Sequence, residues 1–350
     1  MNTKIHPAFK VNDKSFVNSK ELCSFVQKFS LESAVFLEDW FDDKEVVVVQ
    51  TSGSTGVPKT IEIKKSHMRN SALATGDFFE LRAGTRALLC MSSEYIAGKM
   101  MWVRALLLGW EMDVVVPVSN PLSTNTKRYD FSAMVPLQVA NSINELERVK
   151  KLIVGGGVLS KEVEKQLQTV TTKVYATYGM TETVTHIAIK KINQTFASDY
   201  YQTLPSVKVS IDDRGCLVID APKIADEIVV TNDMVEIQSE NSFQWLGRFD
   251  SVINSGGVKI IPEQIEKELS KTISGNFFVA GIHDDLFGEK VVLIVEGKGN
   301  LIQNKPDILH FLKNTKLSAY QVPKAIYFVE KFEMTDTKKI KRKATLSKLF

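Results

Sequence analysis

Between residue 46 and about residue 180, short apolar runs alternate with longer segments in which apolar residues recur at helical spacing. The runs that predict strands are VVVVQ (46–50), ALLCM (87–91), DVVVPV (113–118), KLIVGG (151–156) and KVYATYG (173–179). The segments that predict helices cover 66–81, 96–108 and 160–168, and Ser160 can cap the last of these. Strands and helices that alternate in this way indicate an α/β layer with a mostly parallel sheet.

From about residue 185 the pattern changes to short strands. The segment 207–220 predicts a hairpin that turns at Asp212–Gly215, and 227–248 continues the short strands, so we expect a smaller antiparallel region. A third pattern begins near Gly247, with a Gly256-Gly257 turn, strands at 277–282, 290–297 and 325–330, and helices that begin at Pro262 and cover 306–314. The predicted domains are an N-terminal one over 1–246, a hinge over 247–251 and a small, mobile α+β domain over 252–350.

The composition excludes several classes of function but does not identify one. Hydrophobic residues make up 44% and charged residues 24% of the chain, and the net charge of +3 is too small to indicate a nucleic-acid partner. No apolar run approaches the roughly 18 residues of a membrane span, and the N-terminal residues lack the apolar segment of a signal peptide. The cysteines Cys23, Cys90 and Cys216 have neither zinc-site nor disulfide-framework spacing. We therefore expect a cytoplasmic protein with reduced thiols.

The stretch VVVVQTSGSTGVPKT (46–60) ends a predicted buried parallel strand in small polar residues. Its glycines let the backbone approach a ligand and expose N–H groups, while its hydroxyls and its lysine add donors and a positive charge. The residues that we assign to polyphosphate binding are Thr51, Ser52, Gly53, Ser54, Thr55, Gly56 and Lys59. The spacing is not that of a Walker A loop, and the TIEIKK that follows predicts a strand, so the loop joins two strands as in a hairpin. An ordinary polar turn is the alternative.

Two further motifs follow predicted strands. In YATYGMTET (175–183), Tyr178 can stack on a base, Thr181 can bind a phosphate and Glu182 can hold Mg²⁺, with a helix cap as the alternative. In VGGGVLS (154–160), three glycines permit the close approach of a flat ring, with a tight strand-to-helix turn as the alternative. These glycines are Gly155, Gly156 and Gly157.

A carboxylate and an arginine form the fourth motif. Asp233 in VTNDMVEI can accept hydrogen bonds from both ribose hydroxyls, and Arg248 in WLGRFD can contact the ribose or a phosphate. A turn residue is the alternative for Asp233.

In their kind and order, these motifs resemble those of the acyl-adenylate-forming superfamily, which includes acyl- and aryl-CoA ligases, adenylation domains and luciferases. TSGSTGVPK is similar to that superfamily's phosphate loop almost residue for residue, and the resemblance runs from about residue 46 to the end. It implies an enzyme that binds ATP through the residues assigned above, with Glu182 as the Mg²⁺ ligand. Relatives carry a longer segment before the loop, so we expect a shortened N-terminal region.

The resemblance extends to the basic C-terminal segment MTDTKKIKRKA (334–344). This segment is similar to a T-x-T-G-K-I-x-R element, with Lys338 at the glycine position, which places the catalytic lysine at Lys339. A solvated basic tail is the alternative. Asp250 takes the place of the hinge residue between the two domains. The stretch SGGVKI resembles a loop that helps to form the CoA channel, which implies a role there for Gly256, Gly257 and Lys259.

The stretch SSEYIAGKMMWVRALLLG (92–109) lies where the superfamily shapes its acyl pocket. Tyr95 takes the place of an aromatic residue or histidine, and Lys99 and Arg104 follow among apolar residues. The stretch resembles the o-succinylbenzoate–CoA ligases of menaquinone synthesis, whose substrate is an aromatic dicarboxylate that one or two basic residues would suit. A solvent-facing helix edge is the alternative for Lys99 and Arg104.

The implied reaction has two steps, formation of an acyl-AMP with release of pyrophosphate and then displacement of AMP by the CoA thiol. Its substrates are a carboxylic acid, ATP with Mg²⁺, and CoA. Three alternatives stay open: another aryl or acyl acid, a carrier-protein thiol as the acceptor, and an inactive nucleotide-binding paralogue. The sequence indicates nothing about the oligomeric state.

Overall fold

The computed structural model describes residues 5–50, 60–123, 125–273, 275–297, 317–335 and 340–350. The chain divides into two compact units. The first contains residues 1–209, 219–229 and 238–243, and the second contains 210–218, 230–237 and 244–350. The division therefore passes through four strands between residues 208 and 248, the last of which reaches the expected hinge at 247–251.

A mixed sheet forms the centre of the first unit. Its strands lie in the order β1-β5-β4-β6-β7-β8-β9-β10, and neighbours are parallel from β1 to β8 and antiparallel from β8 to β10. The bounds are β1 (Lys10–Val11), β4 (Arg86–Leu89), β5 (Glu111–Val114), β6 (Tyr129–Met134), β7 (Val149–Val154), β8 (Lys173–Gly179), β9 (His186–Lys191) and β10 (Tyr201–Thr203). The expected α/β layer with a mostly parallel sheet is confirmed.

Strand β6 was not among the expected strands, although it lies between β4 and β7. Its sequence, YDFSAM, carries Asp130 and Ser132 within a short apolar run, so it has neither a continuous apolar pattern nor strict alternation. Ser132 is buried, and its hydroxyl donates a hydrogen bond to the Leu88 carbonyl at 3.0 Å. Tertiary contacts therefore satisfy a polar residue that made the strand hard to recognise.

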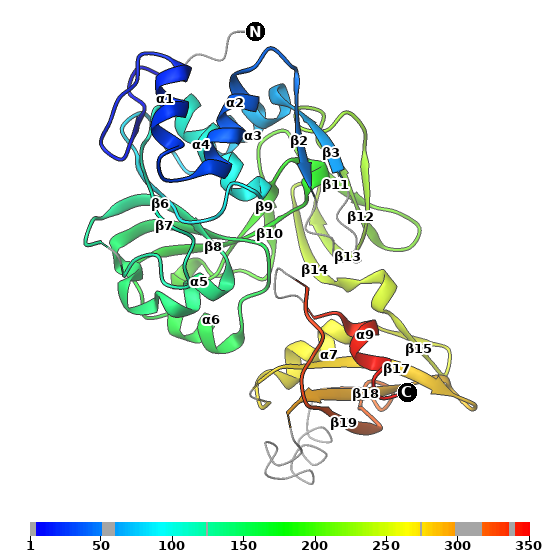
Figure 1. Cartoon of the computed structure of the whole chain (residues 1–350). Helices are drawn as coiled ribbons and strands as arrows, with labels where there is room; N and C mark the ends of the chain where they lie inside the picture. The colour runs from blue at the N-terminus through cyan, green and yellow to red at the C-terminus, as the bar shows by residue number, and fades with distance from the viewer. Residues whose placement is uncertain (1–4, 51–59, 124, 274, 298–316, 336–339) are drawn as a thin grey trace. The chain divides into compact units, whose positions relative to one another are not determined.

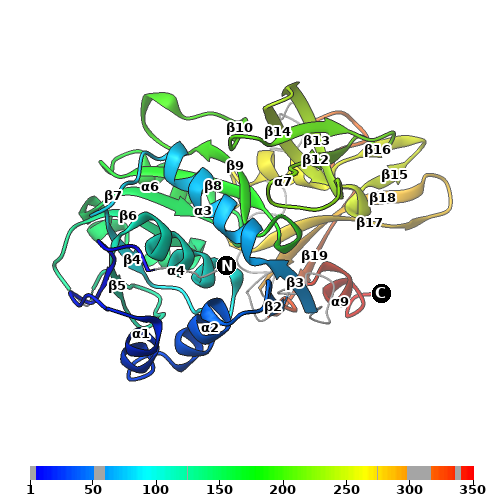
Figure 2. The ribbon, with the colours of Figure 1, turned by 90° about the horizontal axis from the view of Figure 1, so that it is seen from above.

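Helices cover both faces of the parallel strands, with α1–α4 on one side of β6–β8 and α5 and α6 on the other (Figure 1, Figure 2). Their bounds are α1 (Ser19–Val26), α2 (Leu31–Phe41), α3 (Lys65–Phe78), α4 (Ile96–Leu108), α5 (Pro136–Asn141) and α6 (Lys161–Leu167), with 3₁₀ turns at η1 (Ile143–Arg148), η2 (Thr181–Thr183) and η3 (Gln194–Phe196). The expected Ser160 cap is confirmed, since its hydroxyl accepts the Val163 N–H at 3.3 Å. Helix α4 is apolar on nearly every side and buries most of its residues, so it forms part of the core.

The valine run at residue 46 forms strand β2 (Val46–Gln50), which pairs antiparallel with β3 (Thr60–Lys64) in a two-stranded sheet. The predicted hairpin is confirmed, but the expectation of a buried parallel strand is wrong. Val47 and Val49 are buried, whereas Val48 between them is 54% exposed, so only one face of β2 packs on the protein.

Strands β11 (Lys208–Ile211), β12 (Cys216–Asp220), β13 (Val229–Ser239) and β14 (Ser242–Arg248) are hydrogen-bonded in the order β14-β13-β12-β11. The predicted hairpin at Asp212–Gly215 is confirmed, because the Gly215 N–H donates to the Asp212 carbonyl at 2.9 Å and Gly215 has φ +79°. The antiparallel region expected after residue 185 is therefore present.

The rest of the second unit is a small α+β structure. A sheet in the order β16-β15-β18-β17, with β19 parallel to β18, packs α7 on one face and the C-terminal segment with α9 on the other. The bounds are β15 (Ile253–Ser255), β16 (Val258–Ile260), α7 (Pro262–Leu269), β17 (Phe277–Asp284), β18 (Gly288–Glu296), β19 (Ala325–Val329) and α9 (Arg342–Leu346). Gly256 and Gly257 have φ +59° and +80°, which fits a tight two-residue hairpin turn between β15 and β16. The expected helix at 306–314 lies outside the described residues.

Among the residues that the structure describes, no helix is both long enough and apolar enough to cross a membrane.

Candidate active site

The YGMTE motif lies at the carboxyl end of β8, where η2 leads into β9. A Cβ atom on Gly179 would lie 2.2 Å from the Thr185 carbonyl oxygen, so only glycine allows this close approach of the chain to itself. Val184 adopts φ +64° and ψ −60°, a strained conformation for a β-branched residue, and such strain is concentrated at functional sites. Thr183 is buried and donates to a main-chain carbonyl, whereas Thr181 is half-buried and Glu182 is exposed. Thr181 and Glu182 can therefore reach a ligand.

Tyr178 is held in an aromatic cluster. Its ring packs edge-on against Phe243 at a centroid distance of 5.2 Å and against Tyr201 at 5.9 Å, and the Tyr201 and Phe243 rings stack at 5.5 Å. These contacts orient the Tyr178 ring, which remains half-buried. The cluster thus favours a fixed stacking surface, as expected for a residue that contacts a base.

The three glycines of VGGG follow β7, the parallel neighbour of β8. The register pairs Val154 with Ala176, so Gly155–Gly157 and the YGMTE motif emerge from the same edge of the sheet. A Cβ atom on Gly155 would lie 2.7 Å from Thr177 Oγ1, and Gly156 has φ +78°. The structure therefore brings two predicted motifs together at the carboxyl ends of neighbouring strands, the edge at which open α/β sheets bind ligands.

The predicted phosphate loop, residues 51–59, lies outside the described residues. The two strands that it joins are described, with Gln50 paired to Thr60 at the last position of the β2–β3 hairpin. Strand β3 also lies in contact with η2. One strand that flanks the loop is thus close to Thr181 and Glu182.

Asp233, Arg248 and Asp250 lie together in the second unit. Asp233 is buried within β13 and is not a turn residue; its Oδ1 accepts the Trp245 indole N–H at 3.1 Å and lies 3.8 Å from Arg248 Nη1. Arg248 also donates to both Asp250 oxygens at 3.0 Å, and this contact lowers the pKa of Asp250. Arg248 is thus oriented by two carboxylates.

The residues assigned to the CoA channel lie in the β15–β16 hairpin. Gly256 packs near Phe287 and Tyr320, since a Cβ atom there would lie 3.4 Å and 3.1 Å from their rings. Gly257 and Lys259 are exposed. Lys338 and Lys339 lie outside the described residues.

The residues assigned to the acyl pocket, at the N-cap of α4 and along it, do not share one environment. Tyr95 is 44% exposed at the N-cap, and Lys99 donates to the Ser93 carbonyl at 2.6 Å while its ammonium lies 5.1 Å from the Phe36 ring centroid. Arg104 follows Lys99 by five residues, which is roughly 140° around the helix axis. The interpretation of Arg104 as part of a solvent-facing edge is wrong, because only 1% of it is exposed.

Arg104 is a buried cation with unused donors. Its Nη1 lies 3.9 Å from Met101 Sδ, and its Nε and Nη2 have no hydrogen-bond partner among the described residues. Burial lowers its pKa to about 9, which reflects the cost of a charge removed from water without a counter-ion. A carboxylate or phosphate is the kind of group that can accept hydrogen bonds from such a guanidinium.

His186 and Thr75 are buried polar residues that the sequence did not single out. The Thr75 hydroxyl donates to the Ser71 carbonyl at 2.9 Å and lies 3.4 Å from His186 Nε2, so we assign the Nε2 proton to the imidazole. Burial first, and then the charge of Arg104, hold the pKa of His186 well below its usual range, so the ring is neutral. In the sequence, the only indication that His186 belongs to the site was its position four residues after Glu182.

The described residues contain no cluster of three or more His, Cys, Asp or Glu side chains that could hold a metal ion. Sites for a Mg²⁺ ion that accompanies a nucleotide commonly supply one or two carboxylates, and the nucleotide supplies phosphate oxygens. Glu182 is exposed at the same edge of the sheet as Gly155–Gly157 and could supply one such carboxylate.

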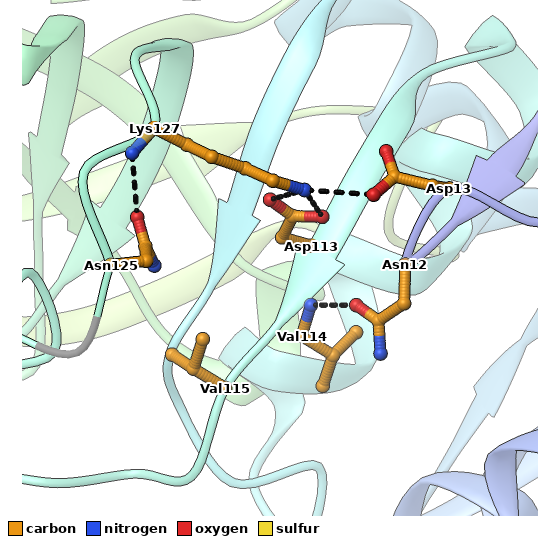
Figure 3. Close-up of a pocket in the computed structure, with 7 residues that line it drawn as sticks. All are labelled: Asn12, Asp13, Asp113, Val114, Val115, Asn125 and Lys127. Carbon is orange, nitrogen blue, oxygen red and sulfur yellow. Dashed lines mark hydrogen bonds and ion pairs between the residues drawn. The ribbon is translucent and has the colours of Figure 1, made fainter.

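A polar pocket of about 240 Å³ lies at β5, separated from β7 by β4 and β6 in the sheet. Its acidic side chains are already paired, because Lys127 Nζ lies 3.0 Å from both Asp13 and Asp113 (Figure 3). We therefore assign it no ligand.

Comparison with known proteins places the fold and the motifs in one family. Residues 28–235 match the family of AMP-binding enzymes. The 2-succinylbenzoate–CoA ligases of Bacillus cytotoxicus and Bacillus cereus are 24% and 25% identical, over 89% and 93% of this chain and 72% of each relative.

Solved structures agree with this placement. An acyl-CoA synthetase (AMP-forming)/AMP-acid ligase II-like protein from Dyadobacter fermentans is 37% identical, covers 95% of this chain and 99% of its own, and has a TM-score of 0.63. The o-succinylbenzoate CoA synthetase of Bacillus subtilis, in complex with its acyl-adenylate intermediate, shares the fold at a TM-score of 0.70 and 17% identity, over 85% of this chain and 68% of its own. The chain belongs to the family of AMP-binding enzymes, the ATP-using acyl-CoA synthetases and ligases that form an adenylate.

Proposed function

We propose that this enzyme activates o-succinylbenzoate, an aromatic dicarboxylate, and transfers the acyl group to CoA. The observation that supports this substrate is Arg104, a buried guanidinium on the helix that follows Tyr95, with two nitrogens that have no hydrogen-bond partner in the described part of the chain. The named function of the Bacillus relatives is consistent with it.

The chemistry of Arg104 favours a second anionic group on the acid. The carboxylate that attacks ATP loses its charge when the acyl-AMP forms, so it cannot be the lasting partner of a buried cation. A second carboxylate stays ionised through both steps and can accept the N–H groups of a planar guanidinium. The neutral His186 beside it adds no competing charge.

In the proposed first step, the substrate carboxylate attacks the α-phosphate of ATP and pyrophosphate leaves. The loop Thr51–Lys59 holds the phosphates, Gly155–Gly157 and Tyr178 hold the base, and Asp233 with Arg248 holds the ribose. Thr181 and Lys339 stabilise the charge that develops on the transferring group. Mg²⁺, bound to Glu182 and phosphate oxygens, would neutralise charge on the pyrophosphate.

In the proposed second step, the small C-terminal domain turns about Asp250, so that Lys339 leaves and the CoA thiol displaces AMP. Gly256, Gly257 and Lys259 would then line the route of the pantetheine arm. Arg248 holds Asp250 through two hydrogen bonds, and these would have to rearrange when the backbone at Asp250 rotates.

The test uses the purified full chain with ATP, Mg²⁺, CoA and a panel of acids. The panel contains o-succinylbenzoate, two analogues that each lack one of its carboxylates, benzoate and a fatty acid. Pyrophosphate release reports the first step, and mass spectrometry reports the thioester. We expect a CoA thioester of o-succinylbenzoate. The analogue without the reacting carboxylate should give no product, and the analogue without the second carboxylate should be poorer by about 100-fold, because it leaves a buried charge unpaired.

Other outcomes identify the alternatives. Equal activity with a monocarboxylate overturns the dicarboxylate assignment. Pyrophosphate release without a CoA thioester, restored by a carrier protein, indicates that other acceptor. No pyrophosphate release with any acid, while ATP still binds, indicates a nucleotide-binding paralogue.

A further inference from the structure

Arg342 fastens the C-terminal segment to the body of the second unit. Its Nη2 lies 2.9 Å from Glu266 Oε2 and 3.5 Å from Glu263 Oε1, both on α7. Its Nη1 donates to the Val279 carbonyl at 3.4 Å, and its guanidinium lies 5.7 Å from the Phe278 ring centroid. One side chain thus connects the C-terminal segment to both a helix and a strand.

The two carboxylates in this contact are buried. Only 9% of the Glu263 side chain and 18% of the Glu266 side chain are exposed, and burial raises the pKa of both, while Arg342 acts in the opposite direction. Glu266 Oε1 also accepts the Val279 N–H at 2.8 Å. Removal of the guanidinium would leave two buried acids without their counter-ion.

Glu263 also touches the segment 247–251. A Cβ atom on Gly247 would lie 2.4 Å from Glu263 Oε2, so that glycine lies directly against the carboxylate. Glu263 therefore lies between the expected hinge segment and the arginine of the C-terminal segment.

The described residues on either side of 336–339 are held together as well. Met334 and Ile340 form an antiparallel bridge, and the Lys341 N–H donates to the Glu333 carbonyl at 2.8 Å. Arg342 follows Lys341 directly. Its contacts with α7 therefore hold the chain three residues after Lys339.

We propose that Glu263, Glu266 and Arg342, here called the α7 clamp, are positioning residues for Lys339 and join its segment to residues 247–251. The clamp links residues 247–251 to residues 340–342, so that the two segments move together. The part that concerns catalysis rests on the proposed function, since it requires Lys339 to act in adenylation.

Loss of the clamp should slow only one of the two steps, the formation of the acyl-AMP. Lys339 takes part in acyl-AMP formation and not in thioester formation, so a misplaced Lys339 slows only the first. A displacement of about 1 Å at a reacting group can cost about 100-fold in rate. We expect Arg342→Met to lower the kcat of adenylation by about that factor with little change in the KM for ATP.

The experiment compares Arg342→Met, Arg342→Lys and Glu263→Gln in the full chain. Lys348→Met is the matched control, because it removes a cation from the same segment whose ion pair, with Glu333, is on the surface. Adenylation is followed by ATP–pyrophosphate exchange and thioester formation by supplying preformed acyl-AMP. We expect Arg342→Met to lose adenylation and keep thioester formation, Arg342→Lys to recover part of the loss, and Lys348→Met to resemble the wild type.

Amide hydrogen exchange gives a readout that does not depend on activity. Glu263→Gln should speed exchange at 340–346 as well as at 248–251, and Arg342→Met should do the same at both segments. If each substitution loosens only its own segment, or if both half-reactions fall equally, the clamp is not a positioning device. An inactive wild type that still shows the linked exchange overturns the proposed function and the catalytic role, but not the mechanical link.

Discussion

Arg104 is fully buried and Arg342 is partly buried, with 29% of its side chain exposed, and their surroundings are opposite. Arg342 meets two carboxylates and a carbonyl, whereas Arg104 meets a methionine sulfur and leaves two nitrogens without partners among the described residues. Removing one partner of a buried ion pair leaves an uncompensated charge and destabilises the protein. A buried charge that has no counter-ion is itself a cost to folding.

This contrast predicts opposite responses to the same substitution. Methionine has a volume similar to that of arginine and no charge. Arg104→Met should therefore stabilise the protein, and Arg342→Met should destabilise it.

The largest effect is expected at Lys339, the residue that the α7 clamp is proposed to position. Lys339→Ala should slow adenylation by about 1000-fold, since it removes a group that stabilises transition-state charge, and largely spare thioester formation from acyl-AMP. Lys338→Ala is the matched control and should have little effect. A larger loss at Lys338 would move the catalytic register by one residue.

Arg104→Met should raise the KM for o-succinylbenzoate by about 100-fold while the protein becomes more stable by about 1 kcal/mol. Steady-state kinetics and urea unfolding measure the two quantities. Lys99→Met, on another side of α4, should change the KM far less. A loss of stability at Arg104→Met would show that the guanidinium has a structural partner.

Arg342→Met should instead destabilise the second unit by about 2 kcal/mol, because it leaves Glu263 and Glu266 without their cation. Urea unfolding followed by hydrogen exchange at β17 and β18 reports this unit. Lys348→Met should stay within about 0.5 kcal/mol of the wild type, as is usual for surface pairs. Equal losses for the two variants would remove the contrast with Arg104.

The smallest expected effect concerns pH. The pKa of His186 is depressed in the folded state, so below its unfolded pKa of about 6.5 the unfolded chain binds the extra proton. Stability should therefore fall as pH drops below about 6.5, by up to about 1.4 kcal/mol per pH unit from this group. His186→Gln should flatten that dependence, and Arg104→Met should weaken it. An unchanged slope in His186→Gln would assign the dependence to other groups.

Much of the fold was predictable because its signals are local. Helix α4 begins and ends at the predicted residues, and the β11–β12 and β15–β16 turns occur where glycine and polar residues predict them. Strand β6 was missed because Asp130 and Ser132 interrupt its apolar pattern, and the valines of β2 indicated a strand without indicating its partner.

For the site, the order of motifs along the chain was sufficient to indicate an adenylate-forming enzyme, since each motif is a short run of residues with its own chemistry. Only the tertiary structure decided which side chains are buried and with what. Arg104 lies on a helix that is apolar on nearly every side, so periodicity assigns it no face. Its burial, and the lack of partners for two of its nitrogens among the described residues, became visible only in the structure. The anchor of Arg342 on Glu263 joins residues almost eighty positions apart, and the cost or gain of burying a charge depends on such distant neighbours.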